Sequence, residues 1–225
     1  MQSAFNIRPL EDSALALETL ALAPEMSVTL GELERDSLVY VSSGAGVLTV
    51  GDDSASVRAR SAGLVPAGEK GTLAASEELA GILVTVGGDV DVHAPMGPRA
   101  LAVSLDDASA QRASGGRSFE ILFGPHNGST RATLFAGFVP PGKAPWHYHL
   151  YDEIVWVPDG PGRLHLEEEE AALEAGAAFR LRPRQVHIVE NAGASEMTII
   201  GVFTPAGSPS AAYLTADVAA EYVAG

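Results

Sequence analysis

Short apolar or alternating runs, each ended by glycine or proline, recur along all 225 residues of the chain. Alternation with a period of two is typical of strands, and the longer period of an amphipathic helix is hard to find. We expect strands at residues 27–33, 37–42, 46–50, 56–59, 63–66 and 81–86 in the first half, and at 119–123, 132–139, 147–149, 154–157, 162–166, 177–181, 187–190 and 196–203 in the second. The sequence therefore predicts an all-β protein, built as a sandwich or barrel.

The two halves follow one plan. The segment LVYVSSGAGVLTVGDD at 38–53 resembles IVWVPDGPGRLHLEEE at 154–169, and AGLVPAGEKGTL at 62–73 resembles AAFRLRPRQVHI at 177–188. Similarity at a spacing of roughly a hundred residues indicates an internal repeat of one structural unit.

The segment between the two copies is rich in Pro, Gly and Ser at its ends. Such composition is typical of connecting chain. We therefore expect a first unit at 1–92, a linker at 93–118 with a helical turn at 104–111, and a second unit with its tail at 119–225.

Charge and composition narrow the possible partners. The chain has 14 Lys and Arg against 29 Asp and Glu, a net charge of −15, so nucleic-acid and anionic membrane partners would be repelled. It has no Cys, so a metal site must use His and carboxylate ligands. The apolar run at 14–23 contains Glu18, and the first ten residues carry only Arg8 as a basic group, unlike a signal peptide. A cytoplasmic protein with no membrane segment is the expectation.

The stretch PWHYHLYDE, starting at Pro145, concentrates possible metal ligands. Side chains two apart in a strand share a face, so His147 and His149 should project together. A tight turn then allows Glu153 to begin the neighbouring strand beside them, and His187 can complete the set from a strand distant in sequence. Imidazole with carboxylate suits one divalent ion of Fe, Mn, Ni, Cu or Zn. A His-x-His pair alone is often a coincidence, and the other histidines, His93, His126 and His165, are expected in the linker or on the surface.

The spacing from Gly142 resembles the first motif of the cupin family: Gly, His-x-His, a Glu after three residues and Gly160 after six more. One residue is missing before the first His. The second motif is matched more loosely by Gly176, Pro183, His187 and Asn191. Gln185 stands near the position of a family glycine, and the step from Pro183 to His187 is one residue short.

The resemblance implies two cupin barrels in one chain, each a jelly-roll or double-stranded β-helix, with a metal site formed by His147, His149, Glu153 and His187 in the second barrel only. In the first copy, alignment of Gly44 with Gly160 places Gly31, Leu33 and Ser37 at the first three positions, and Gly71 or Thr72 at the fourth. None of these is a good ligand for a transition metal.

Cupin members catalyse many reactions, so the fold does not decide the function. The expectation is a metalloenzyme acting on a small organic metabolite, with dioxygenase-type chemistry favoured. The alternatives are a metal-assisted isomerase or lyase, and a non-catalytic cupin that binds or senses a small molecule.

Several side chains near the motif have expected roles as well. Tyr151 is a candidate for contact with the substrate. Trp146, Tyr148 and Trp156 have the parity of the outer face, and this predicts burial against the other barrel or, as we favour, in a homodimer that the first barrel helps to form. Three arginines close to His187 could bind an anionic substrate or form salt bridges: Arg180, Arg182 and Arg184.

Overall fold

The structure is a computed structural model, and it describes residues 14–88, 90–105, 111–113 and 116–215. The first half contains β1 (Leu15–Leu22), β2 (Ser27–Leu30), β3 (Arg35–Ser43), β4 (Ala45–Val50), β5 (Asp53–Arg58), β6 (Ser61–Val65), β7 (Gly71–Ala75), β8 (Leu79–Gly87) and β9 (Ala102–Ser104). The second contains β10 (Gln111–Arg112), β11 (Ser118–Phe123), the 3-10 helix η3 (Pro125–Asn127), β12 (Thr133–Val139), β13 (Gly142–Lys143), β14 (His147–His149), β15 (Asp152–Trp156), β16 (Gly162–Leu166), β17 (Glu170–Leu173), β18 (Ala178–Leu181), β19 (His187–Asn191), β20 (Met197–Thr204) and β21 (Ala212–Leu214).

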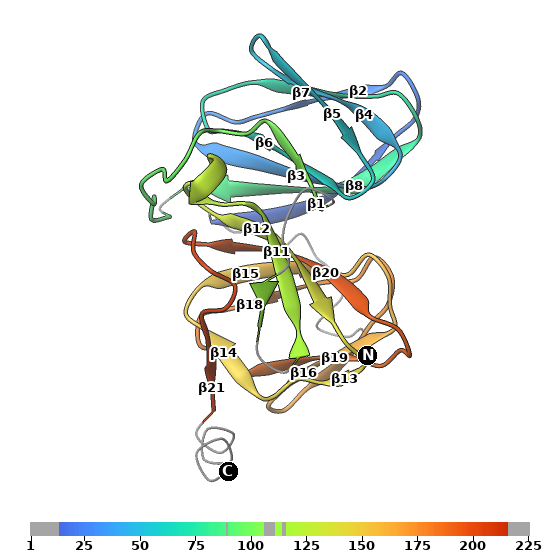
Figure 1. The fold of residues 1–225 in the computed structure, drawn as a ribbon, viewed down its shortest axis with the longest axis vertical. Helices are drawn as coiled ribbons and strands as arrows, with labels where there is room; N and C mark the ends of the chain where they lie inside the picture. Colours follow the sequence, from blue (N-terminus) through green and yellow to red (C-terminus); the bar gives the residue numbers. More distant parts are fainter. Residues whose placement is uncertain (1–13, 89, 106–110, 114–115, 216–225) are drawn as a thin grey trace.

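Each half forms two facing antiparallel sheets (Figure 1). In the first half the sheets run β1-β8-β3-β6-β9 and β2-β7-β4-β5. In the second they run β10-β11-β12-β20-β15-β18 and β17-β16-β19-β14-β21, with β13 beside β19. The order β1-β8-β3-β6 recurs as β12-β20-β15-β18, and β2-β7-β4-β5 recurs as β14-β19-β16-β17. The predicted all-β fold with two jelly-roll barrels is confirmed.

Several strands lie where none was expected. They are β1, β7, β9, β10, β13, β17 and β21. Two of them fall in the expected linker: β9 pairs with β6 of the first barrel, and β10 pairs with β11 of the second. Most of the expected helical turn at 104–111 lies outside the described residues, and the exact domain boundaries stay a prediction.

The two barrels pack through their larger sheets. One apolar cluster joins outward side chains of β3, including Leu38 and Tyr40, to Ile154 and Trp156 of β15. Trp156 is 7% exposed, and its ring meets the ring of Tyr40 edge-on with centroids 6.3 Å apart. The first barrel of the same chain therefore covers Trp156, so this residue does not present a surface for a second chain. Trp146 and Tyr148 are half-buried, and Tyr148 stacks on Tyr213 of β21. The homodimer stays a prediction.

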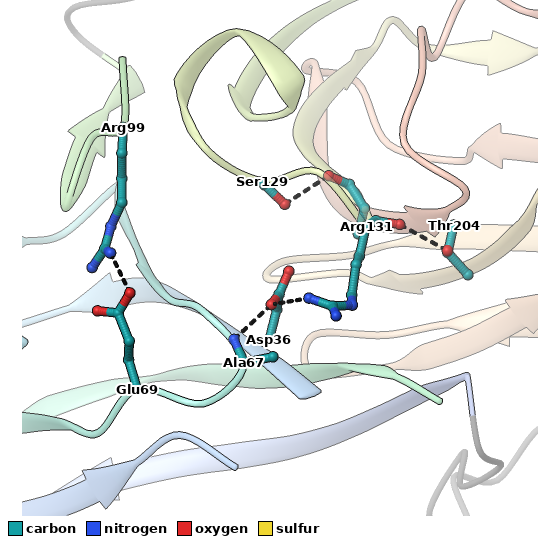
Figure 2. Close-up of polar contacts among 8 residues, drawn as sticks. Asp36, Ala67, Glu69, Arg99, Ser129, Arg131 and Thr204 are labelled. Atoms are coloured by element: carbon teal, nitrogen blue, oxygen red, sulfur yellow. Dashed lines mark hydrogen bonds and ion pairs between the residues drawn. The ribbon is translucent and has the colours of Figure 1, made fainter. Parts of the chain in front are cut away.

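An ion pair lies beside this apolar interface (Figure 2). The carboxylate of Asp36 at the start of β3 accepts hydrogen bonds from the guanidinium of Arg131 at 3.1 Å and from the backbone N–H of Ala67 at 2.8 Å. The carbonyl of Arg131 in turn accepts a hydrogen bond from Thr204. Asp36 is buried, so its charge requires these partners, and the pairing fixes the second barrel against the first.

In the described part of the chain, no helix has the length and apolar character that crossing a membrane requires.

Candidate metal centre

Three buried histidines converge inside the second barrel. His147 and His149 alternate inward from β14, and the antiparallel register sets His147 directly opposite His187 of β19. One ligand atom from each lies within 4.8 Å of the other two. The ring centroids of His147 and His187 are 4.3 Å apart, and those of His149 and His187 are 4.8 Å apart. Strand parity thus supplies one pair of imidazoles, and pairing across the sheet supplies the third.

Two of the three rings are oriented by backbone carbonyls. Nδ1 of His147 lies 2.9 Å from the carbonyl oxygen of Pro145, and Nδ1 of His187 lies 2.9 Å from that of Gln185. A carbonyl oxygen can only accept, so each Nδ1 carries the proton and Nε2 keeps its lone pair. Such a hydrogen bond from the second ring nitrogen is usual for histidines that bind metal.

The electrostatic surroundings keep these imidazoles neutral. Burial and, after it, the positive charge of Arg117 together lower the pKa of His147 to about 3. The pKa of His187 is well below its usual value, again chiefly because of burial and then because of His147 and His149. Neutral imidazole is the form that coordinates a cation.

Glu153 stands beside the triad. Its buried Oε2 is 3.1 Å from the buried Nδ1 of His149. Among the described residues, neither of these two atoms has a hydrogen-bond partner. Gly201 on β20 leaves room for the carboxylate, because a Cβ there would lie 2.9 Å from Oε1 of Glu153. A buried carboxylate oxygen and an imidazole nitrogen without hydrogen bonds fit a divalent cation that would satisfy both.

The triad opens into a cavity of the second barrel. Its walls are mainly apolar and aromatic, with Phe119, Phe135 and Ile199 among them. Tyr151 also lines it, stacked between His149, at 4.5 Å between centroids, and Phe203, at 4.0 Å. Burial, and then the negative charge of Glu153, raises the pKa of Tyr151, so the phenol keeps its proton. Tyr151 therefore lies on the cavity wall next to the candidate ligands, and its contact with a substrate stays a prediction.

Two of the three arginines near His187 form salt bridges with Asp152. Arg180 donates two hydrogen bonds, of 2.7 and 2.6 Å, to the carboxylate of Asp152, and Arg182 donates a third at 3.1 Å. Arg184 is exposed and stands at a left-handed turn with φ of 67°. None of the three lines the described cavity, so the salt-bridge alternative is the one that the structure favours.

Asn191, the last residue of the second motif, has a structural role. Its side-chain amide donates to the carbonyls of Val139 and Ser195, and its carbonyl oxygen accepts from the N–H of Gly193. Outside the cavity, His165 is 7% exposed and contacts Glu170 and Glu190, whereas His126 and His93 are exposed.

Sequence reasoning missed two parts of the cavity wall. Arg117 precedes β11 in the expected linker, and Pro209, Ser210 and Ala212 come from the segment around β21. Strand β21 pairs with β14 along its whole length, from His147 opposite Leu214 to His149 opposite Ala212. No local pattern marks either part, because only tertiary pairing brings them to the cavity.

The equivalent place in the first barrel is filled. Leu30 pairs with Gly71 in the way that His147 pairs with His187, so the structural register is one residue away from the expected Gly31. Leu30 and Val65 belong to an apolar cluster in the interior of this barrel, and a Cβ on Gly71 would lie 2.7 Å from Cγ2 of Val65. Of the other expected positions, Ser37 is buried and Leu33 is 83% exposed. The described part of this barrel offers no cluster of three ligands.

We therefore expect metal uptake to approach one ion per chain and not two. Elemental analysis of protein purified without chelators or a metal-affinity tag measures this ratio. A reproducible second ion bound at a different site would show that the first barrel has ligands that its register does not reveal.

Comparisons with known proteins agree with this architecture. Residues 135–203 match the family described as "Cupin domain". No curated protein matches the chain in sequence. Most of the second barrel thus matches the cupin domain model, and the repeated topology gives the first barrel the same jelly-roll plan.

Solved structures share the fold at low identity. A variant of oxalate decarboxylase OxdC from Bacillus subtilis has a TM-score of 0.74 and 16% identity over 90% of this chain and 71% of that one. AerE from Microcystis aeruginosa has a TM-score of 0.69 and 16% identity, over 88% and 96% of the two chains. An IolB-like protein from Salmonella typhimurium LT2 has a TM-score of 0.73 and 12% identity, over 91% and 89%. At such identities the likeness concerns the fold.

Proposed function

We propose that the second barrel binds one divalent transition-metal ion through His147, His149, His187 and Glu153, and that the protein is a metalloenzyme acting on a small organic molecule. The observation that carries the proposal is the convergence of three buried imidazoles beside a buried carboxylate oxygen that lacks a hydrogen bond. Fe, Mn, Ni, Cu and Zn all accept this ligand set. The oxalate decarboxylase of Bacillus subtilis has Mn(II) centres. Manganese and iron are therefore the first ions to test.

A bound ion would supply a Lewis acid and an open coordination position for substrate. The protein's own side chains would exclude water, position the substrate and accept a proton. The aromatic wall excludes water, the protonated Tyr151 can donate a hydrogen bond, and Glu153 is the one carboxylate among the described residues of the cavity wall that can accept a proton. A mainly apolar cavity with a few convergent polar groups is typical of a site for a small molecule.

Oxygenase-type chemistry is the leading proposal. We expect anaerobically iron-loaded protein to consume dioxygen in proportion to one of a panel of phenolic and keto-acid substrates, as measured with an oxygen electrode. His187→Ala protein, treated in the same way, provides the control for free iron. Uptake equal in both proteins would contradict the proposal.

A lyase is the second candidate, and the shared fold with oxalate decarboxylase favours it. In this case the loaded protein would release carbon dioxide from an acid without net oxygen consumption. If the loaded protein binds a small molecule but neither consumes dioxygen nor releases carbon dioxide, the non-catalytic binding or sensing role is the one that remains. A cytoplasmic location stays a prediction from the sequence.

A further inference from the structure

Gly201 lies in the middle of β20, where a strand usually carries a side chain. The antiparallel register sets it directly opposite Phe135 of β12 on one side and opposite Val155 of β15 on the other. Both of these residues line the cavity, and directly opposite residues share a face of the sheet, so position 201 faces the cavity as well. Glycine weakens the interior of a strand and often marks a place that another group approaches closely.

Two groups from the neighbouring strands meet above Gly201. A Cβ on this residue would lie 2.3 Å from Cε1 and 2.5 Å from Cζ of Phe135, and 2.9 Å from Oε1 of Glu153. The ring of Phe135 therefore extends over β20, and its tip and the carboxylate of Glu153 border the same small space. A side chain at position 201 would have to displace one of these groups or both.

The position of the Phe135 ring is itself fixed by other rings. Phe135 is buried, and its ring packs edge-on against Phe119, with centroids 6.5 Å apart, and against Phe203, with centroids 5.9 Å apart. Phe203 in turn stacks on Tyr151. These four residues form one apolar cluster beside the cavity. Because close packing leaves little space for another rotamer, the tip of the Phe135 ring stays beside Glu153.

No hydrogen bond from the described residues holds Oε2 of Glu153 in place. This oxygen is buried 3.1 Å from Nδ1 of His149, and neither atom has a hydrogen-bond partner in the described part of the chain. The two oxygens of a carboxylate turn together about one bond, so a contact that limits the place of Oε1 also limits the direction of Oε2. The contact above Gly201 is such a limit, and with it Oε2 faces the histidines.

We propose that Phe135, seated over Gly201, is a positioning residue that holds the carboxylate of Glu153 with Oε2 toward the histidine triad before an ion binds. A ligand that is already in place loses less conformational freedom on binding, so the ion binds more tightly. Phe135 acts through Glu153 and touches no reacting atom in this role. The inference rests on the proposed function, because it takes Glu153 as a metal ligand.

The test follows Mn(II) and Co(II) binding to the apoprotein. Calorimetry gives the Mn(II) affinity, and the visible absorption spectrum of bound Co(II) reports the geometry of its ligands. We expect Gly201→Ala and Phe135→Ala each to weaken Mn(II) binding by about tenfold or more, as for other groups that orient a metal ligand, and to change the Co(II) spectrum. Phe135→Leu fills part of the same space and should lose less affinity than Phe135→Ala.

A double variant tests whether the two residues act as a pair. In a chain that already carries Phe135→Ala, the added methyl of Gly201→Ala no longer meets a ring. Residues in contact have non-additive effects, so the second substitution should weaken Mn(II) binding by less than about threefold. Fully additive losses would show that Phe135 and Gly201 act on the ion independently, and would overturn the proposed pairing.

Gly63→Ala is the matched control for the added methyl. A Cβ on Gly63 would lie 2.5 Å from Cδ2 of Leu48, a buried side chain of the first barrel. The described part of that barrel has no cluster of three ligands. Gly63→Ala should therefore lower the unfolding midpoint through overpacking, while the Mn(II) affinity and the Co(II) spectrum match those of the wild type.

The outcomes separate the inference from the proposed function. If the wild-type protein takes up no metal, the proposed function fails and the inference with it. If the wild type binds one ion, and Gly201→Ala and Phe135→Ala bind Mn(II) as tightly with an unchanged Co(II) spectrum, the inference alone is overturned. Weaker binding with an unchanged spectrum also overturns it, because a general loosening of the barrel would do the same. Thermal unfolding identifies any variant that does not fold, and the milder Phe135→Leu then decides by its spectrum.

Discussion

His187→Ala is expected to abolish stoichiometric metal uptake, and His147→Ala is expected to do the same. The two rings face each other across the β14–β19 pair, and each has its Nδ1 held by a backbone carbonyl. Removing either leaves two imidazoles and a carboxylate. Loss of a group that hydrogen-bonds to a metal ligand costs about 10- to 100-fold in metal affinity, so loss of the ligand itself should cost more than about 100-fold.

Elemental analysis and calorimetric titration of tag-free protein measure this loss. His93→Ala is the control, because that exposed histidine lies outside the cavity and its Nδ1 contacts only the carbonyl of Ala94 among the described groups. Thermal unfolding of each apoprotein tests that the barrel is intact. Full occupancy in both ligand variants would refute the assignment.

The fold was largely predictable because the apolar pattern that indicates strands occurs once in each half of the chain. The alternating runs of β3, β4 and β6 recur in β15, β16 and β18, and the two sets occupy the same places in their sheets. Most of the missed strands lack such a signal. β17 follows an acidic run, β9, β10, β13 and β21 have only two or three residues, and β1 carries Glu18 within an apolar run. These strands form because neighbouring strands offer hydrogen-bond partners, and this information is not local.

The candidate site was predictable in part for the same reason. Strand parity places His147 and His149 together, and the turn before β15 brings Glu153 beside His149. The opposition of His147 and His187 depends on a register between strands that are far apart in sequence, and the residues themselves do not specify it. Arg117 could not be found in this way, because the pairing of β10 with β11 is what places it at the cavity.

The sequence correctly predicts that Trp156 faces outward from its barrel, but strand parity cannot say which surface covers a side chain. The first barrel covers it. Trp156→Ala should therefore lower the free energy of unfolding by about 3–5 kcal/mol, the usual cost of truncating a buried aromatic residue to alanine. The loss should appear as a lower denaturant midpoint, with one ion per chain retained because Trp156 points away from the metal cavity.

Trp156→Phe is the matched control for this variant. The buried Nε1 of Trp156 has no hydrogen-bond partner among the described residues, so phenylalanine removes a polar atom that folding leaves unsatisfied while it keeps the contact with Tyr40. Its cost should stay below about 1.5 kcal/mol, as for other swaps that nearly conserve apolar volume. Trp156→Glu should destabilise the chain at least as much as alanine, since it places a charge between the barrels. If light scattering showed that Trp156→Glu halves the mass of the particle without moving the unfolding midpoint, Trp156 would lie between two chains, and the packing of the two barrels within one chain would be wrong.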